Sequence, residues 1–376
     1  MKNILITGGA GFIGSNVALS LIQKGYQVRV LDNLSKQIHG QNPKIDSPLY
    51  NLIKEKVEFI EGTVASKDDW ISAIKNQDAI IHLAAETGTG QSMYEIQKYC
   101  DVNIAGTALL LDILTNSEHR VSKVIVASSR AIYGEGKYRS DKYGFVYPDS
   151  RKSEDMQAGH FEVKYLDDED LELCATDELS RIAPTSVYGI TKQVQEQLVL
   201  TVCNSIGLKA IAFRYQNVYG PGQSLSNPYT GILSIFSSRI LNGQPINIFE
   251  DGLESRDFVY IDDVVDATVA GLESNIENEV FNVGTGVATT VKKVVEVLMK
   301  CYQKEVETTV SGNFRLGDIR HNYADIEKIN KMLNFAPRIS FEKGIENFTQ
   351  WVVRQPIMKS GYEKSLEEMK KKGLFK

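Results

Sequence analysis

The sequence has few of the residues that build metal centres and disulfide frameworks. Its four cysteines are scattered without any C-x-x-C pair, at Cys100, Cys174, Cys203 and Cys301, and its five histidines are equally dispersed. Disulfide scaffolds and zinc sites need such residues at close, paired spacings. We therefore expect ordinary thiols, no metal site, and a satisfied core position for His82, which stands inside an apolar run.

Long hydrophobic runs and basic clusters are also missing. No apolar stretch reaches the roughly 18 residues that a membrane-spanning helix requires, and the net charge is −6. The lysine-rich segment 364–376 also holds acids, so we expect an exposed helix or a frayed end there. We expect no nucleic-acid partner and no membrane association. Because the first residues already form an apolar strand, with no room for a signal peptide, we expect a soluble cytoplasmic protein.

The beginning of the chain carries a pattern that points to chemistry. An apolar run, Lys2 to Thr7, leads into a glycine-rich turn, and apolar residues then recur at helical spacing. Gly9, Gly11 and Gly14 satisfy G-x-G-x-x-G, in which glycines allow a tight turn and a close approach of the backbone to a pyrophosphate at a helix N-terminus. The pattern predicts dinucleotide binding, with contacts from Gly8, Gly11, Phe12, Ile13 and Gly14.

The next apolar strand, Gln27 to Leu31, ends in Asp32. An acid about 20 positions beyond the glycines binds the two ribose hydroxyls of NAD and repels the additional phosphate of NADP. No arginine adjoins Asp32 on its C-terminal side, where Asn33 follows. The sequence therefore predicts NAD as the cofactor, with Asp32 and Asn33 among its contacts.

Strands and helices alternate through the first half of the chain. After a polar, loop-like stretch to about Lys56, the expected elements are a strand over 57–60, a helix over 67–74, a strand over 79–85, a helix over 93–114 and a strand over 123–128. Such alternation predicts an α/β protein with a Rossmann-type, doubly wound parallel sheet. Ligands bind these sheets beyond the carboxyl ends of the strands, which here are the loops after Thr7, Leu31, Leu83 and Ala127.

A phenol and an ammonium lie four residues apart, at Tyr188 and Lys192, on a helix expected to start after the capping candidates Thr185 and Ser186. Positions i and i+4 share one helix face, and a neighbouring cation can lower the pKa of a phenol. The pair is therefore a candidate acid/base device, although such spacing also occurs on solvated helix faces. Ser129, at the end of an expected strand, is equally open to a structural or a functional role.

Several motifs agree in order along the chain: Thr7 to Gly14, His82 to Ala85, Asp101 to Thr107, Ser128-Ser129 before Tyr133-Gly134, and Tyr188 with Lys192. Together they resemble the extended short-chain dehydrogenase/reductases that act on nucleotide sugars, from residue 1 to about residue 355. The resemblance implies tightly bound NAD that is regenerated in each turnover. It also implies that Ser129, Tyr188 and Lys192 are the catalytic residues.

The resemblance extends to other contacts. It implies that the cofactor is lined by Val64, Leu83, Ala84, Ala85 and Asn103. In relatives an aspartate often follows the glycine that ends the third strand, and here Thr63 and Val64 follow Gly62. The substrate contacts that it implies are Thr87, Ser129, Asn217, Arg256, Arg315 and Asp318, with the two arginines on the diphosphate.

The resemblance also divides the chain. It implies an NAD-binding domain over residues 1–215 and a smaller α/β lobe for the substrate over 216–376, with a segment near 258–283 returning to the first domain. An insert over 137–184 holds twelve acids and seven bases, a balance of −5. Relatives can carry two zinc-ribbon cysteine pairs in this insert, whereas here Ser140, Tyr143 and Tyr165 stand near where cysteines would fall. A lone Cys174 cannot hold a metal.

Two details separate the reactions of the family. Its 4,6-dehydratases carry Asp-Glu directly after the active-site hydroxyl, where Arg130 and Ala131 stand in this chain, and its reductases more often use NADPH. We therefore expect redox-neutral 4-epimerisation. A 4-keto sugar reductase or C4 dehydrogenase is the alternative, and a non-catalytic nucleotide sensor is disfavoured by the complete set of catalytic residues.

The substrate and the assembly follow from the same resemblance. The segments Gly88 to Tyr94 and Leu225 to Gly231 look most like the dTDP-L-rhamnose 4-epimerase group, with UDP-glucose or UDP-N-acetylglucosamine as alternative substrates. Relatives pair the helix that begins at Ser186 and the one that ends near Leu114 with their two-fold mates. We therefore expect a homodimer held by a four-helix bundle.

Overall fold

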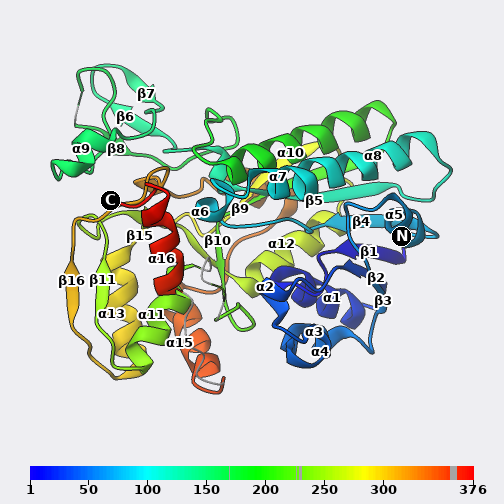
Figure 1. The fold of residues 1–376 in the computed structure, drawn as a ribbon. Helices are drawn as coiled ribbons and strands as arrows, with labels where there is room; N and C mark the ends of the chain where they lie inside the picture. Colours follow the sequence, from blue (N-terminus) through cyan, green and yellow to red (C-terminus); the bar gives the residue numbers. More distant parts are fainter. Residues whose placement is uncertain (169, 226, 228–230, 356–361) are drawn as a thin grey trace.

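A seven-stranded parallel sheet organises the computed structural model, which describes residues 1–168, 170–225, 227, 231–355 and 362–376 (Figure 1). The strand order is β14-β9-β5-β4-β1-β2-β3. The strands are β1 Asn3–Thr7, β2 Gln27–Asp32, β3 Glu58–Glu61, β4 Ala79–His82, β5 Lys123–Ser129, β9 Lys209–Tyr215 and β14 Glu279–Val283. Because helices cover both faces, the inner strands read as continuous apolar runs, as parallel sheets require.

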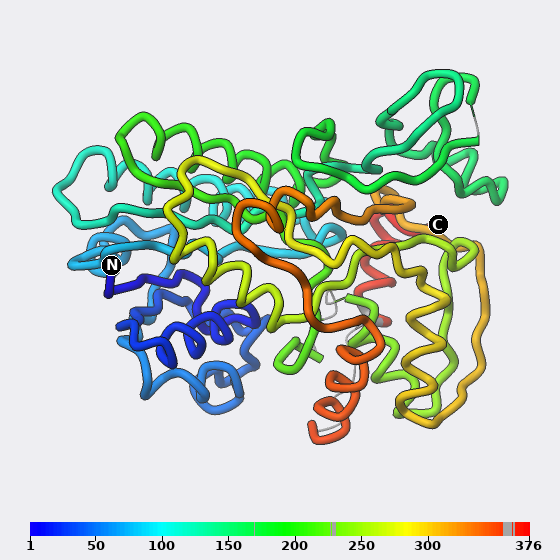
Figure 2. The backbone as a smooth tube through the Cα atoms, turned by 180° about the vertical axis from the view of Figure 1, so that it is seen from behind, coloured from blue at the N-terminus to red at the C-terminus, as the bar shows by residue number. Residues whose placement is uncertain are grey.

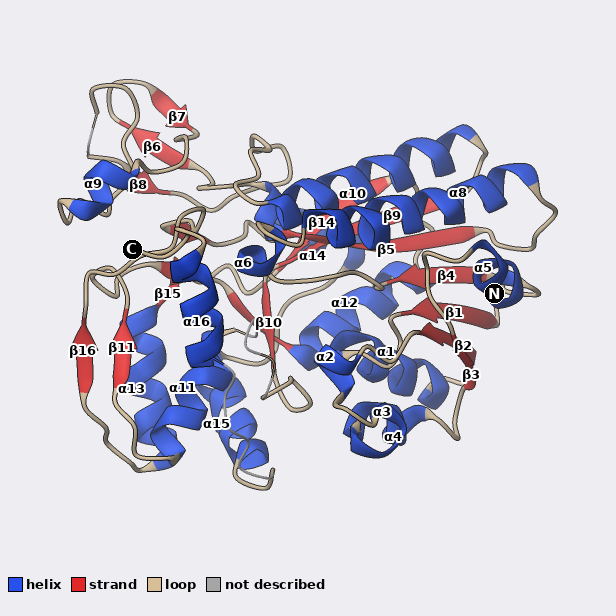
Figure 3. Ribbon diagram, viewed as in Figure 1, coloured by secondary structure: helices blue, strands red, loops and turns tan. Residues whose placement is uncertain are grey.

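Helices pack on both faces of this sheet (Figure 3). α1 (Phe12–Gln23) and α12 (Ile261–Glu273) share one apolar core with one face of the sheet. α5 (Lys67–Ile74), α8 (Gly106–Asn116) and α10 (Val187–Ser205) share a second core with the other face. The predicted Rossmann-type α/β fold is therefore confirmed, and the carboxyl ends of β1, β2, β4, β5 and β9 meet at one edge.

Two connections differ from their expected form. The expected helix over 93–114 is built in pieces, α6 Thr89–Ser92, α7 Ile96–Tyr99, the π-helical turn Cys100–Ala105, and α8. The polar stretch that was expected as a loop contains the short helices α2 Lys36–His39, α3 Pro43–Asp46 and α4 Pro48–Ile53. Prolines at the first positions of α3 and α4 explain these starts, because a proline fits the first helical turn, where its missing N–H has no partner to lose.

The second half of the chain builds a smaller region beside the sheet. Its helices are α11 Ile232–Leu241, α13 Val291–Tyr302, α14 Glu327–Leu333 and α15 Phe341–Val352. Short strands pair as β10 (Asn217–Tyr219) with β13 (Phe258–Tyr260), β11 (Ile246–Ile248) with β16 (Thr308–Val310), and β12 (Ser255–Arg256) with both β15 (Thr289–Thr290) and β17 (His321–Asn322). Between β13 and β15 in the chain, α12 and β14 return to the large sheet.

The acidic insert is a small unit of its own. Its strands β6 Tyr138–Ser140, β7 Gly144–Val146 and β8 Glu172–Leu173 form a sheet. The helix α9 Ser153–Gln157 lies between β7 and β8 in the chain. Two buried arginines fasten this unit to the second half of the chain, since Arg151 donates to both carboxylate oxygens of Glu250 at 2.7 and 2.8 Å and Arg320 donates to Glu162 at 2.9 Å. Figure 2 shows the insert lying against the C-terminal region from behind.

The positions that replace the zinc-ribbon cysteines come together in the insert. The Ser140 hydroxyl donates to the Asp168 carboxylate and accepts from the backbone N–H of Tyr143 at 3.0 Å. The rings of Tyr143 and Tyr165 lie edge to face, 5.8 Å apart. A hydrogen bond and a ring contact thus join residues 140–143 of the insert to residues 165–168.

The lysine-rich C-terminal segment forms the helix α16 (Tyr362–Lys371). Met369 and Phe375 are buried, and the backbones of Lys376 and Phe314 exchange hydrogen bonds in both directions. The expected exposed or frayed end is instead a docked helix. Across the residues described, none of the helices combines the length and the apolar character needed to span a bilayer.

Candidate active site

The glycine turn opens the site. Gly8 has a φ of +66°, and a Cβ added there would stand 2.8 Å from the backbone nitrogen of Ala84. A Cβ on Gly14 would stand 2.3 Å from the carbonyl oxygen of Gly8. Gly11 precedes α1, and no side chain caps the first turn of that helix. The turn thus leaves the N–H groups at the start of α1 open, as a pyrophosphate site requires.

A cavity of about 1200 Å³ runs from this turn along the edge of the sheet. It collects all but one of the residues predicted to contact the cofactor, namely Gly8, Gly11, Phe12, Ile13, Gly14, Asp32, Asn33, Val64, Leu83, Ala84, Ala85, Tyr188 and Lys192. Thr87 and Ser129 line the same cavity. The exception is Asn103, which is fully buried behind the wall, where its amide pairs with the backbone of Glu86 at 2.8 and 3.1 Å and with Thr191 at 2.9 Å.

Asp32 both lines the cavity and fastens the glycine turn. Its carboxylate accepts hydrogen bonds from the backbone N–H of Ala10 at 3.0 Å and of Leu34 at 2.9 Å. His39, which the sequence analysis did not single out, lies 3.7 Å away and hydrogen-bonds Ser47 through its other nitrogen at 2.8 Å. Burial raises the pKa of Asp32 and lowers that of His39.

The catalytic candidates meet at the other end of the cavity. The helix that carries them begins as predicted, because the Ser186 hydroxyl accepts from the Gly189 N–H at 3.2 Å and caps α10. Burial raises the pKa of Tyr188, while the neighbouring Ser129 hydroxyl and the nearby charge of Arg130 act to lower it. A phenol beside a serine hydroxyl in the wall of a cofactor cavity can exchange a proton with a bound hydroxyl.

Lys192 lies in a buried polar network beneath Tyr188. Its ammonium donates to Oε1 of Gln195 at 2.7 Å, and burial lowers its pKa to about 7. The amide nitrogen of Gln195 reaches Thr107 at 2.9 Å and His82 at 3.2 Å. His82 also hydrogen-bonds Thr7 at 2.7 Å, and burial lowers its pKa to about 3, so the expectation of a satisfied, neutral core histidine is confirmed.

The positive charge that acts on the Tyr188 phenol is that of Arg130, which stands where the family's dehydratases are expected to carry an acid. Arg130 lowers the pKa of Tyr188, whereas Lys192 was expected to do so. The pKa of Arg130 itself falls to about 9, first through burial and then through the charge of Arg256. The sequence could have indicated this role, because Arg130 directly follows Ser129. The Ser129 hydroxyl accepts from the Ala131 N–H at 3.1 Å and so caps the turn that contains Arg130.

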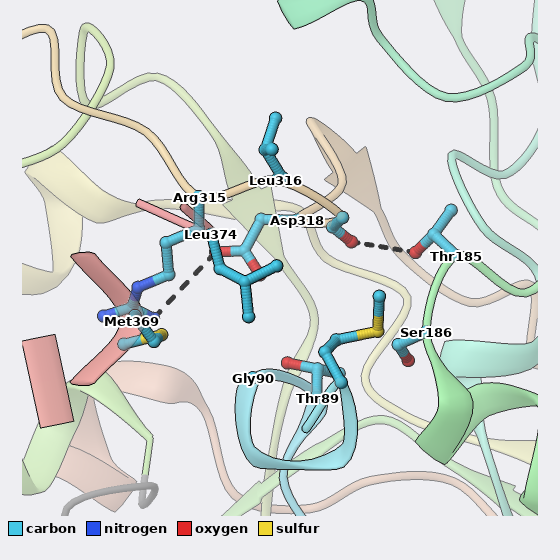
Figure 4. Close-up of a pocket in the computed structure, with 11 residues that line it drawn as sticks. Thr89, Gly90, Thr185, Ser186, Arg315, Leu316, Asp318, Met369 and Leu374 are labelled. Atoms are coloured by element: carbon cyan, nitrogen blue, oxygen red, sulfur yellow. Dashed lines mark hydrogen bonds and ion pairs between the residues drawn. The ribbon is translucent and has the colours of Figure 1, made fainter. Parts of the chain in front are cut away.

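The predicted diphosphate contacts are not in the large cavity. Arg315 and Asp318 line a small separate pocket with Thr185, Ser186 and Met369, and the Arg315 guanidinium lies 3.9 Å from the Asp318 carboxylate (Figure 4). Arg256 donates instead to three backbone carbonyls, those of Ser255, Ile319 and Arg320, at 2.7 to 2.9 Å.

Asn217 also lies outside both pockets, at the start of β10, where its backbone N–H donates to Asp257 at 2.9 Å. Its side-chain oxygen is buried and has no hydrogen-bond partner among the residues described. Within the described part of the chain, no three histidine, cysteine, aspartate or glutamate side chains gather in a way that could hold a metal ion.

Comparison with known proteins agrees with this geometry. The profile of the NAD dependent epimerase/dehydratase family matches residues 4–154 and 165–284. A dTDP-L-rhamnose 4-epimerase of Burkholderia thailandensis is 36% identical over 94% of this chain and 96% of its own length. A Thermotoga maritima UDP-glucose 4-epimerase, solved with UDP-glucose, is 31% identical at a TM-score of 0.74 over 94% of this chain and 99% of its own.

A solved UDP-glucuronic acid 4-epimerase of Bacillus cereus, in complex with UDP-glucuronic acid and NAD, is 26% identical at a TM-score of 0.74, and covers 94% of this chain and 99% of its own. The chain therefore belongs to the NAD dependent epimerase/dehydratase family. It is an NAD-using enzyme, an isomerase. The uncapped helix start and the glycine cradle fit this cofactor on the geometry alone.

Proposed function

We propose that this enzyme inverts the C4 centre of a nucleotide-diphosphate sugar, and that the sugar is a dTDP-6-deoxy-L-hexose of the dTDP-L-rhamnose kind. The observation that carries the reaction is that Ser129 and Tyr188 lie together in the cofactor cavity, where the serine hydroxyl acts to lower the pKa of the phenol. The 36% identity to a dTDP-L-rhamnose 4-epimerase supports the sugar. Of the two sequence segments that favoured this substrate, the first lies at α6, and Ser226 and 228–230 of the second lie outside the described residues.

Tyr188 is the proposed proton carrier. As the phenolate, its oxygen takes the proton of the sugar 4-hydroxyl while C4 loses a hydride, and as the phenol it returns that proton after the 4-keto sugar has turned its other face. NAD supplies the hydride acceptor and donor for these two half-reactions. Ser129 orients the sugar oxygen and, from its place beside Tyr188, helps to stabilise the phenolate form.

Lys192 and Asp32 are the proposed cofactor anchors. Lys192 lines the cavity beside Tyr188 and can donate to a ribose hydroxyl, and Asp32 can accept from the two hydroxyls of the other ribose. Arg315 and Asp318, at the small pocket near Ser186, are proposed to hold the diphosphate and the nucleoside ribose. Thr87 adds a sugar contact, while Arg256 supports the surrounding backbone.

The architecture around this site is proposed on the same grounds. Residues 1–215 would bind NAD and 216–376 would mainly hold the substrate, with α12 and β14 returning to the large sheet. We propose that the enzyme works in the cytoplasm as a homodimer, with α8 and α10 at its interface.

The decisive experiment follows hydrogen at C4. The purified enzyme is incubated with nucleotide sugar deuterated at C4, without added cofactor, and the epimers are resolved by NMR. We expect full retention of deuterium at C4 of the product, because Tyr188 and Ser129 act on a proton bound to oxygen. Deuterium lost to water would indicate deprotonation at carbon, and a stoichiometric demand for nicotinamide would indicate a reductase or dehydrogenase.

The substrate panel decides the sugar. dTDP-L-rhamnose should give the highest kcat/KM, with UDP-glucose and UDP-N-acetylglucosamine as the competitors. UDP-glucose is included because a structure of similar fold was solved with it. A higher kcat/KM for either UDP sugar would move the assignment to that sugar and leave the 4-epimerase reaction standing.

A further inference from the structure

Gln216 is a buried amide without a partner in the wall of the active-site cavity. It follows the last residue of β9, is 5% exposed and lines the cavity. Among the residues that the structure describes, neither its amide nitrogen nor its amide oxygen has a hydrogen-bond partner. The hydroxyl of Ser128, in the same wall, is also buried and has no partner in the described part of the chain.

Such an amide needs an explanation. Buried polar atoms in folded proteins are almost always hydrogen-bonded, and one left unpaired costs free energy. A leucine has nearly the same volume and would fill the position without that cost. An unpaired amide in a cavity wall is therefore best explained by a ligand that supplies its partners.

The backbone places this amide at the reacting end of the cavity. β5 and β9 pair in parallel with Ser129 opposite Tyr215, so Gln216 lies one residue beyond the partner of the catalytic serine. Its backbone N–H donates to Val283 at 2.9 Å, and a Cβ on Gly284 would stand 2.7 Å from its Cγ. The base of the side chain is thus held firmly.

Two polar side chains near this amide, those of Tyr215 and Asp257, already have partners of their own. The Tyr215 hydroxyl is bonded to Thr268 at 2.7 Å. The Asp257 carboxylate accepts from the N–H and hydroxyl of Thr285 at 2.8 and 2.6 Å and from the N–H groups of Gly286 and Ala324 at 3.0 and 3.2 Å. The possible partners of the Gln216 amide are then the unpaired Ser128 hydroxyl and a ligand in the cavity.

We propose that Gln216 is a substrate-positioning residue whose amide pairs with hydroxyls on the hexose ring of the nucleotide sugar. An amide offers donors and an acceptor side by side, and vicinal sugar hydroxyls offer both in return. The carboxamide of the nicotinamide has the same chemistry and is the competing source. This inference rests on the proposed function, since it assigns the sugar its place in that site.

The test combines a substitution with substrate analogues. Gln216→Leu is compared with the unaltered enzyme on the epimerised nucleotide sugar and on its 2-deoxy and 3-deoxy analogues, with bound NAD measured for each protein. Gln350→Leu, at an exposed glutamine on α15, is the matched control. We expect Gln216→Leu to lose about 10-fold in kcat/KM on the native sugar, with unchanged NAD content.

The analogues identify the contact. With the unaltered enzyme, one deoxy analogue should show a kcat/KM about as far below that of the native sugar as the substitution causes. With Gln216→Leu, the same analogue should show no further loss of kcat/KM, because both changes remove the same hydrogen bond. The variant should also show a higher Tm in the NAD-loaded, sugar-free state, since it removes the unpaired amide. Additive losses on both analogues, or normal kinetics, would overturn the inference, and loss of NAD would assign the amide to the nicotinamide.

Failure of the proposed function has a different signature. If the unaltered enzyme binds nucleotide sugars but epimerises none, the same cycle is run on dissociation constants from calorimetry, with the tightest-binding sugar and its deoxy analogues. Non-additive losses there would still support the Gln216 contact, and additive losses would overturn it.

Discussion

The Lys192 ammonium donates to Oε1 of Gln195 over 2.7 Å, in a site so enclosed that the pKa of Lys192 falls to about 7. Burial therefore disfavours the charged form in the folded protein, while the unfolded chain keeps an ordinary lysine pKa near 10.5. Between pH 7 and 10.5 the unfolded state binds more protons, so this residue makes the folded protein more stable as the pH rises.

We predict that Lys192→Met is more stable than the unaltered protein at pH 6 and nearly inactive. The gain should be about 1–3 kcal/mol, since removing the buried charge is partly offset by leaving the Gln195 oxygen unpaired. Urea unfolding of the NAD-free proteins at pH 6 and pH 9 measures it, and the gain should shrink at pH 9. If Lys192→Met is less stable than the unaltered protein at both pH 6 and pH 9, burial of the Lys192 charge does not destabilise the folded protein.

Tyr188→Phe should abolish most turnover while leaving the site intact. Without the phenol, the 4-hydroxyl proton has no acceptor, and we expect kcat to fall on the order of 10²-fold or more. NAD content and nucleotide-sugar affinity should persist. Tyr143→Phe, at a tyrosine of the insert, is the control and should keep full activity. Near-normal turnover of Tyr188→Phe would place the base elsewhere.

Asp32→Asn should narrow the preference for NAD over NADP. The amide keeps the size of the carboxylate but loses the charge that repels the 2′-phosphate, so we expect the ratio of the two affinities to fall at least about 10-fold, or about 1.4 kcal/mol. Because Asp32 also holds the Ala10 N–H, NAD affinity itself should weaken. Titration with both cofactors measures this, with Asp68→Asn, at an exposed position of α5, as control. Equal affinity of the unaltered enzyme for both cofactors would contradict the prediction.

The outward face of α10 is predicted to form the dimer interface. Ile190 is 47% exposed, and Val187 and Val194 beside it are half-buried. α8 lies alongside α10 on the same side of the sheet (Figure 1). Light scattering at micromolar concentration should report a dimer mass that Ile190→Glu lowers to a monomer. Leu179→Glu, 96% exposed in the insert, should stay dimeric; a monomeric unaltered protein would refute the interface.

The elements that the sequence predicted well are those whose signals are local. The glycine turn, the Ser186 cap and the end of the second strand at Asp32 are set by residues within a few positions of one another. The nearby cluster of short helices after Asp32 was missed because its composition is that of a polar loop.

The buried face of α10 could not be predicted in this way. Its inward residues include Lys192, Gln195 and Glu196, while Ile190 points outward. Gln195 is satisfied by His82, which is 113 residues away in sequence, and Glu196 by Arg214 at 3.0 Å. Partners so distant leave no local signal. For the same reason the sequence could not show that Arg256, an isolated arginine, donates hydrogen bonds to three backbone carbonyls.

The return of β14 to the edge of the large sheet has a consequence for how the two regions can be separated. Phe281 of β14 lies opposite Phe213 of β9, and both are completely buried. A chain cut near residue 216 would lose that strand and α12, and would expose β9 as a bare, apolar edge. The regions are therefore not interchangeable modules: grafting either onto another protein would require taking both, and heating should melt them in a single step.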